Sequence, residues 1–213
     1  MAALTRPRSS IRPSSAKPRR TMRMSYDEFL QTDFDHNHFE WVDGRVVERA
    51  PVESNHDAIS GFLFRILSDW LDENGGGRIT MDPFQMRLAG RPSGRAPDLQ
   101  IILPRSLPRL KKMYMDGPAD VVIEIISTGS RSTDRRTKFA EYEQAGVPEY
   151  WLIDPLRKQA EFYVHEKGRF IPAELDEKTG RFHSRMLRGV WLDVEWLWDL
   201  PSKAEILKKW KVK

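Results

Sequence analysis

The sequence lacks cysteine entirely, which excludes disulfide bonds, thiolate metal sites and cysteine nucleophiles. It also lacks any apolar run near the roughly 18 residues that a membrane-spanning helix needs, and its first residues lack the apolar core of a signal peptide. We therefore expect a cytoplasmic protein with no membrane partner. Any metal site must be built from oxygen or histidine ligands.

Acidic residues are absent from the first 24 positions, and this absence explains the basic character of the whole chain. The formal charge is +4, but 28 of the 35 basic residues and all 31 acidic ones lie after residue 24, so that part carries −3. We expect residues 1–24 to form a disordered basic tail, either simply solvated or touching nucleic acid nonspecifically. Its composition also resembles a transit peptide, although no amphipathic helix is visible in it.

Residues 25–200 read as one domain, followed by a basic C-terminal segment over 201–213. Ser25 and Glu28 predict a capping box, Asp43-Gly44 predicts the turn of a β-hairpin, and apolar spacing predicts an amphipathic helix over 55–73. Further strands are expected around 78–81, 84–88, 98–103, 120–127, 149–155 and 160–164, with a second helix over 133–145. This order predicts an α/β or α+β fold in which a mixed central sheet is flanked by helices and preceded by a hairpin.

Glu124 is the only charged residue in the apolar run 121–126, and Asp98 stands just before the apolar run 99–103. A strand that is apolar at both parities is buried on both faces, so Glu124 would leave water at a cost of several kcal/mol unless a cation or good donors neutralise it. Two carboxylates on neighbouring core strands are what a divalent metal site for phosphodiester chemistry requires.

Four ordered motifs carry a resemblance to a known family. They are Pro97-Asp98 before an apolar strand, Ala119 to Ser127 around Glu124, Asp134-x-x-x-Lys138-x-x-x-Tyr142, and Ala145 to Pro155. Together they resemble the Uma-two family, described as "putative restriction endonuclease" and placed in the PD-(D/E)XK nuclease superfamily. The hairpin containing Glu40 and the helix opening near His56 match its layout too, so the resemblance covers roughly residues 25–200.

The resemblance implies a restriction-endonuclease-like core in which Asp98 and Glu124 bind Mg²⁺, with Mn²⁺ as a substitute. The superfamily places a lysine two residues after the second carboxylate, but Ile126 stands there. In the family the next helix supplies the lysine, and Lys138 occupies the matching place. Glu40 is implied as a further metal ligand or supporting acid, with His56 and Tyr142 as auxiliary residues.

The chemistry is consistent with this implication. Mg²⁺ prefers oxygen ligands and keeps several waters, so two carboxylates, a backbone carbonyl such as that of Ile125, and a substrate phosphate would suffice. Arg131, Arg135 and Arg136 precede or start the Lys138 helix, where they would grip a phosphate backbone or simply be exposed.

Each of these residues also has a structural interpretation. Glu124 would serve as a buried ion-pair partner, Asp98 as a strand cap, Lys138 as a surface lysine paired with Asp134, Glu40 as an exposed hairpin residue and His56 as a cap or packing residue. Asp33, Asp35, His36 and His38 resemble a metal cluster but lie in a turn outside the matched motifs. Trp191, Trp196 and Trp198 are expected in the core or at a dimer surface rather than as a base-stacking platform.

Three functions follow from these patterns. The first is a metal-dependent endonuclease that hydrolyses DNA phosphodiester bonds, working as a homodimer. The second is a catalytically silent protein of nuclease fold that binds nucleic acid or assembles with a partner. The charge of −3 after residue 24 gives the domain no obvious face for binding a duplex, which weakens the case for DNA. The third is a metal-dependent hydrolase of another phosphoester, such as RNA or a nucleotide.

Overall fold

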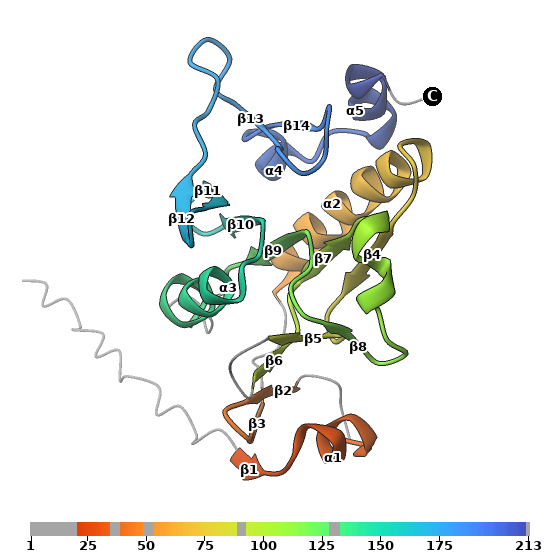
Figure 1. The fold of residues 1–213 in the computed structure, drawn as a ribbon. Helices are drawn as coiled ribbons and strands as arrows, with labels where there is room; N and C mark the ends of the chain where they lie inside the picture. The colour runs from red at the N-terminus through yellow and green to blue at the C-terminus, as the bar shows by residue number, and fades with distance from the viewer. Residues whose placement is uncertain (1–20, 35–38, 49–52, 89–92, 128–132, 212–213) are drawn as a thin grey trace, which may run out of the picture.

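A computed structural model of the chain describes all residues except 1–20, 35–38, 49–52, 89–92, 128–132 and 212–213 (Figure 1). The proposed cluster around Asp35, His36 and His38, most of the basic tail, and Arg131 therefore lie outside the described residues.

A mixed six-stranded sheet forms the centre of the fold, as the sequence predicts. Its order is β12-β11-β10-β9-β7-β4, and only β9 and β10 run parallel. The strands are β4 (Arg78–Met81), β7 (Leu99–Ile102), β9 (Val121–Ile125), β10 (Glu149–Asp154), β11 (Gln159–Glu166) and β12 (Arg169–Pro172). Every residue of β7, β9 and β10 is buried, because layers of side chains cover both faces of these strands.

A second six-stranded sheet, of order β1-β3-β2-β6-β5-β8, contains the predicted hairpin. Its strands are β1 (Thr21–Arg23), β2 (Phe39–Val42), β3 (Arg45–Glu48), β5 (Gln85–Leu88), β6 (Ser93–Arg95) and β8 (Tyr114–Asp116). Asp43 and Gly44 make the hairpin turn with φ of 50° and 73°, a left-handed backbone that glycine and aspartate tolerate better than most residues. The same sheet places Glu40 of β2 near Arg95 of β6.

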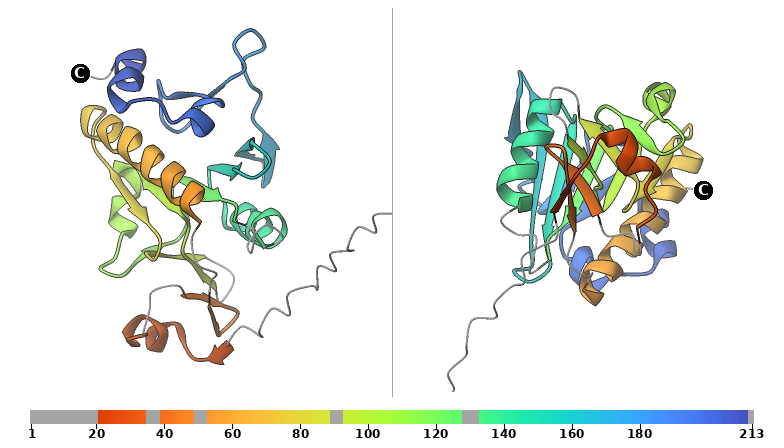
Figure 2. Two further views of the ribbon diagram at one scale, coloured as in Figure 1. Left: turned by 180° about the vertical axis from the view of Figure 1, so that it is seen from behind. Right: turned by 90° about the horizontal axis from the view of Figure 1, so that it is seen from below.

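Helix α2 (Ser54–Glu73) packs on one face of the central sheet (Figure 1). Its apolar stripe, including Ile59, Phe62 and Ile66, meets the side chains of Ile123 and Ile125. The C-terminal part adds β13 (Arg181–His183), β14 (Trp191–Asp193), α4 (Trp196–Asp199) and α5 (Lys203–Trp210) to this face. Figure 2 shows these elements gathered beside α2, away from the N-terminal hairpin.

The opposite face of the central sheet is covered by α3 (Phe139–Ala145) and by strands of the second sheet. Tyr142 of α3 packs there with Val122, Ile126 and Tyr150. Glu124 has the same parity as Val122 and Ile126, so its carboxylate faces this layer. The second sheet and α3 therefore enclose the side of β9 that carries the acid.

Several local predictions are confirmed, and some details differ. The capping box of Ser25 and Glu28 starts α1 (Tyr26–Gln31), and α2 matches the predicted amphipathic helix. The short strands β6, β8, β12 and β13 were not predicted, because three or four residues give too little periodicity to recognise. The predicted helix over 133–145 begins as a π-helical segment, Thr133–Lys138, before α3.

Both ends of the ordered domain reach beyond the boundaries that the sequence suggests. Residues 21–23, assigned to the disordered tail, form β1 and pair with β3. The C-terminal segment forms α5, whose Ile206 and Trp210 are buried beside α2, while Lys203 Nζ lies 2.8 Å from an Asp69 carboxylate oxygen. Backbone pairing and apolar burial explain why these segments are ordered despite their basic residues.

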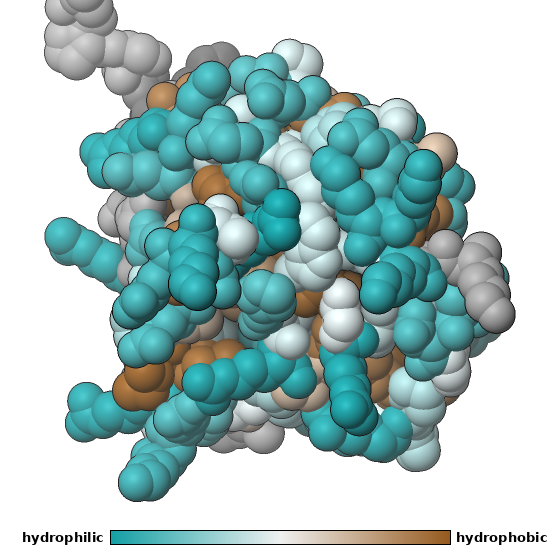
Figure 3. All heavy atoms as spheres, turned by 90° about the horizontal axis from the view of Figure 1, so that it is seen from above, coloured by the Kyte–Doolittle hydropathy of each residue, from teal (hydrophilic) through white to brown (hydrophobic). Residues whose placement is uncertain are grey.

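The face over β13, β14, α4 and α5 is mainly hydrophilic, with hydrophobic side chains exposed only in small patches (Figure 3). None of the helices in the described part of the chain has the length and apolar composition that crossing a lipid bilayer requires.

Glu149, at the start of β10, attaches the C-terminal part to the central sheet. Its Oε1 accepts hydrogen bonds from Trp151 Nε1 and Ser184 Oγ, both at 2.7 Å, and its Oε2 accepts from the backbone N–H groups of Arg185 at 2.8 Å and Met186 at 3.1 Å. Burial raises the pKa of this carboxyl above its usual range, although all four donors favour the ionised form. One side chain therefore satisfies four donors from two separate segments.

We expect Glu149→Gln to lower the free energy of unfolding by about 2 kcal/mol or more, because the amide NH₂ cannot accept the two hydrogen bonds that one carboxylate oxygen accepts. Urea unfolding followed by circular dichroism measures the change, with exposed Glu174→Gln as the matched control. An unchanged urea midpoint for Glu149→Gln would show that the hydrogen bonds of this carboxylate do not stabilise the fold.

Candidate active site

The structure brings Asp98 and Glu124 to neighbouring positions on adjacent antiparallel strands. Leu99 of β7 pairs with Ile123 of β9, and continuing this register by one residue places Asp98 opposite Glu124. Directly opposed residues of an antiparallel pair share a face, so both carboxylates lie on the same side of the sheet. Their exposed fractions are 3% and 0%. The two acids that the sequence singles out therefore form one buried pair of positions.

Asp98 is held by a backbone donor and by a histidine. Its Oδ2 accepts a hydrogen bond of 2.6 Å from the N–H of Ile125, and His56 Nε2 lies 3.0 Å from the same oxygen. His56 is in the first turn of α2 and is buried. The structure thus makes His56 an auxiliary residue of the acid site rather than an isolated helix cap.

Glu124 is held by the two helical residues that the family pattern points to. Lys138 Nζ lies 2.8 Å from Glu124 Oε2, and the Tyr142 hydroxyl donates a 2.6 Å hydrogen bond to Oε1. Lys138 and Tyr142 are four residues apart and so project from the same side of the helix. Lys138 is 2% exposed, which rules out the solvated surface lysine that the structural interpretation describes.

Arg95 and Glu141 complete the network, and neither was identified from the sequence. The Arg95 guanidinium grips Glu141 through two hydrogen bonds, of 2.6 and 2.9 Å, and donates a third of 3.0 Å to Glu40 Oε2. Lys138 Nζ lies 3.6 Å from the other oxygen of Glu40. The helical spacing of Lys138, Glu141 and Tyr142 would have indicated Glu141, whereas Arg95 lies on a strand too short to signal burial.

Glu40 therefore lies between two cations instead of completing a set of three metal ligands. In the described residues no group of three or more histidine, aspartate or glutamate side chains is arranged to hold a metal ion. Glu40 pairs with Arg95 and lies 3.6 Å from Lys138, and its role as a further metal ligand stays a prediction. Mg²⁺ commonly takes only one or two protein carboxylates and retains water, so Asp98 and Glu124 fit it without a third acid.

The described contacts of the network join buried acids to buried bases. Four buried carboxylates, those of Glu40, Asp98, Glu124 and Glu141, lie within ion-pair distance of Arg95, Lys138 or His56. The carboxylate oxygens of Asp98 and Glu124 are the kind of ligand that a hard divalent cation prefers.

Burial and neighbouring charges shift the pKa values of Tyr142 and Arg95, two members of the network. Burial, followed by the charge of Glu124, raises the pKa of Tyr142 well above its usual value, so the phenol remains a donor. Burial opposes the charge of Arg95, but the hydrogen bond to Glu141 and the charges of Glu40 and Glu141 more than offset it, and the pKa of the guanidinium rises.

Of the predicted phosphate-binding arginines, the structure describes the side chain of Arg136 alone. Arg136 is exposed in the π-helical segment, the side chain of Arg135 is not described, and Arg131 lies outside the described residues. Of the tryptophans, Trp191 and Trp196 pack against each other with ring centroids 4.7 Å apart, as expected for core residues. Trp198 is only partly buried.

We expect Tyr142→Phe to lower the free energy of unfolding by about 1–3 kcal/mol, because Glu124 Oε1 loses a buried donor. A phenol whose folded-state pKa is raised stabilises the fold fully below its unfolded pKa of about 10 and less as pH rises further. The substitution should therefore also reduce the loss of stability above about pH 10. Urea midpoints between pH 8 and 11 measure both effects. Tyr163→Phe, which removes a partly buried hydroxyl that donates to Glu161, is the matched control; equal behaviour of the two variants would contradict the prediction.

Comparison with known proteins identifies the fold and the family of the chain. Among solved structures, the chain is similar to "a putative nuclease belonging to DUF820" from Anabaena variabilis ATCC 29413, with a TM-score of 0.67 and 17% identity over 83% of this chain and 98% of that one. This similarity establishes a shared fold. No curated protein matches the chain.

The model of the Uma2 family, described as "Putative restriction endonuclease", matches residues 26–195, which include every member of the buried network. The chain therefore belongs to the Uma2 family.

Proposed function

We propose that this protein is a Mg²⁺-dependent endonuclease that hydrolyses phosphodiester bonds of DNA. The observation that carries the proposal is the buried pair of opposed carboxylates, Asp98 and Glu124, with the Lys138 ammonium 2.8 Å from Glu124. Family membership and the shared nuclease fold support it. A homodimer, which would place two such sites on the two strands of a duplex, belongs to the same proposal.

Asp98 and Glu124 would hold the metal ion, which when bound would activate a water and neutralise charge on the phosphate. The Ile125 N–H and His56 orient Asp98, and Tyr142 orients Glu124, so both acids are fixed before substrate arrives. Lys138 supplies a positive charge beside Glu124, where it would orient the attacking water and stabilise the developing negative charge. Arg95 pairs with Glu141 and Glu40, and Glu40 also lies 3.6 Å from the ammonium of Lys138, so Glu40 and Glu124 share this lysine.

The ion pair between Lys138 and Glu124 also favours a second candidate. A lysine 2.8 Å from the carboxylate already neutralises one buried charge without metal. A catalytically silent protein of nuclease fold that binds nucleic acid or a partner would need nothing more. Metal binding and cleavage, measured together, separate the two candidates.

We expect the wild-type protein to nick supercoiled plasmid in Mg²⁺ or Mn²⁺ and to lose this activity in EDTA. Asp98→Asn and Glu124→Gln should each reduce cleavage by at least about 100-fold, because each removes a charged metal ligand while keeping side-chain shape. Gel analysis of nicked and linear plasmid measures the rate, and circular dichroism checks folding.

Asp120→Asn is the matched control for these two variants. Asp120 is also buried and also accepts hydrogen bonds, from the Arg105 guanidinium and the backbone N–H of Leu103, but it belongs to none of the contacts of the network. Its variant should retain cleavage. A wild-type protein that neither cleaves nor binds Mn²⁺ by calorimetry would establish the silent candidate instead.

Lys138→Met should reduce cleavage by about 100-fold or more while leaving Mn²⁺ affinity unchanged or higher, because the variant removes the cation that shares Glu124 with the metal. Calorimetry for Mn²⁺ and the plasmid assay together measure this split. A folded Lys138→Met protein that cleaves like wild type would remove the lysine from the proposed mechanism.

A further inference from the structure

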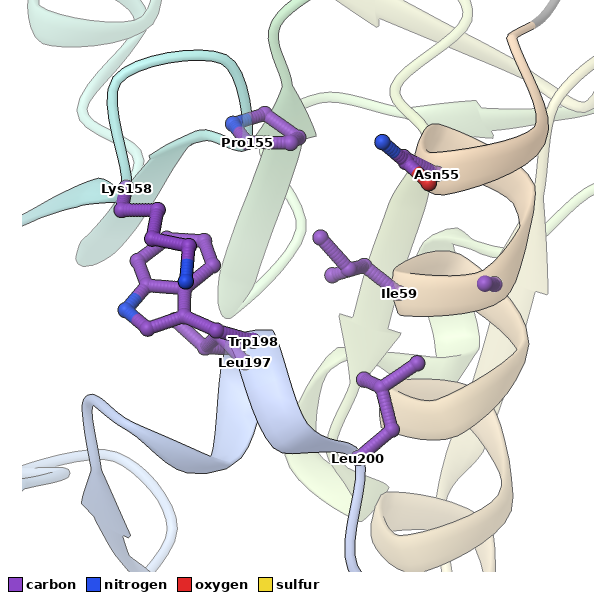
Figure 4. Close-up of a pocket in the computed structure, with 8 residues that line it drawn as sticks. Asn55, Ile59, Pro155, Lys158, Leu197, Trp198 and Leu200 are labelled. Atoms are coloured by element: carbon purple, nitrogen blue, oxygen red, sulfur yellow. The ribbon is translucent and has the colours of Figure 1, made fainter.

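A pocket of about 130 Å³ opens between the first turns of α2, the turn that follows β10, and α4 (Figure 4). Its lining includes Ile59 of α2, Pro155 and Lys158 of the turn, and Trp198 of α4. The space is well below the roughly 300–1,000 Å³ that encloses a drug-sized ligand. It suits one flat ring system rather than a large molecule.

The pocket lies on the α2 face of the central sheet, near the end of β10, whereas Asp98 and Glu124 lie on the other face of the sheet. Asn55, which lines the pocket, directly precedes His56, whose Nε2 lies 3.0 Å from Asp98 Oδ2. Pro155 follows Leu152, the neighbour of Glu124 in the sheet, by three residues. Three residues of extended chain span about 10 Å, the length of one or two nucleotides, so a strand that passes the end of β10 can meet both places.

The chemistry of the lining matches a nucleotide. Trp198 offers an indole face, and in the described part of the chain this ring has no aromatic partner and its N–H makes no hydrogen bond. Ile59 provides an apolar surface across the pocket, as Figure 4 shows. Indole rings stack on nucleobases of any sequence because every base has a π-face.

Lys158 adds the charge that a nucleotide requires. It is exposed, and no described carboxylate lies within ion-pair distance of its ammonium. Figure 4 shows its side chain running beside Trp198, so a phosphate at the mouth of the pocket would meet this ammonium while the attached base meets the indole.

We propose that this pocket binds an unpaired base of the nucleic acid strand next to the scissile phosphate, with Lys158 on the adjoining phosphate. The inference rests on the proposed nuclease function and specifies its substrate as a strand with at least one unstacked nucleotide. A base held by Trp198 would fix the register of the strand across Asp98 and Glu124. The acidic character of the rest of the domain then matters less, because stacking supplies affinity that phosphate contacts alone would not.

The test uses a 12-nucleotide single-stranded DNA that carries 2-aminopurine, whose fluorescence reports stacking, in Ca²⁺ so that no cleavage occurs. We expect wild-type protein to bind the probe and quench the fluorophore. Trp198→Leu should weaken binding by about 5- to 100-fold and abolish the quenching. Lys158→Gln should weaken binding and lower the slope of log affinity against log salt by about one.

Arg157→Gln is the control for Lys158→Gln, because Arg157 is an exposed basic residue of the same turn that does not line the pocket. It should leave affinity within about 2-fold, as expected for a screened surface charge. Lys158 is exposed, so its variant remains informative even if Trp198→Leu does not fold. If the wild-type protein does not bind the probe, or if affinity and fluorescence are the same in all variants, the proposal that this pocket binds a base is wrong.

The two proposals fail separately. Plasmid cleavage that persists in Trp198→Leu at the wild-type rate and KM, with no quenching of the probe, would overturn the base pocket and leave the nuclease. Quenching that depends on Trp198 in a protein that never cleaves would support the pocket and overturn the nuclease.

Discussion

The rest of the site depends on one constraint, which is that several charged side chains are buried together and must neutralise one another. Glu124 is fully buried in the middle of the central sheet, and its carboxylate is acceptable there only because Lys138 and Tyr142 reach it from the helical segment. Arg95 meets the same requirement for Glu40 and Glu141. Because each partner comes from a different element, the packing of β2, β6, β9 and α3 is tied to the electrostatics of the site.

The two faces of the central sheet carry different kinds of side chain. The face of the central sheet toward α2 is filled with apolar side chains, whereas the face toward α3 and the second sheet carries the buried acids. His56 lies at the start of α2 and reaches Asp98 at the beginning of β7, so this helix also contributes to the layer of buried acids. The small pocket lies on the α2 face of the sheet, and its lining contains none of the acids.

Lys138 meets the electrostatic requirement of Glu124 from another element of the fold. Ile126 packs in the core beside Tyr142 and Val122, and Lys138 brings an ammonium to Glu124 from the helical segment. An ion pair needs only the right position of the charged group, so the cation beside a strand residue can come from a different element. Burial distinguishes this lysine from a surface residue, and sequence spacing alone does not.

The sequence by itself determined the parts that depend on local pattern. Apolar periodicity predicted α2, Asp43-Gly44 predicted the hairpin, and the apolar surroundings of Glu124 predicted a buried acid that needs a partner. Only the tertiary structure revealed the second group of buried charges, around Arg95. Arg95, Glu40 and Glu141 are far apart in the chain, and their contacts arise from strand register and from the packing of α3. Such long-range contacts leave no periodic signal, because a side chain's partner across a sheet is set by pairing and not by its neighbours in sequence.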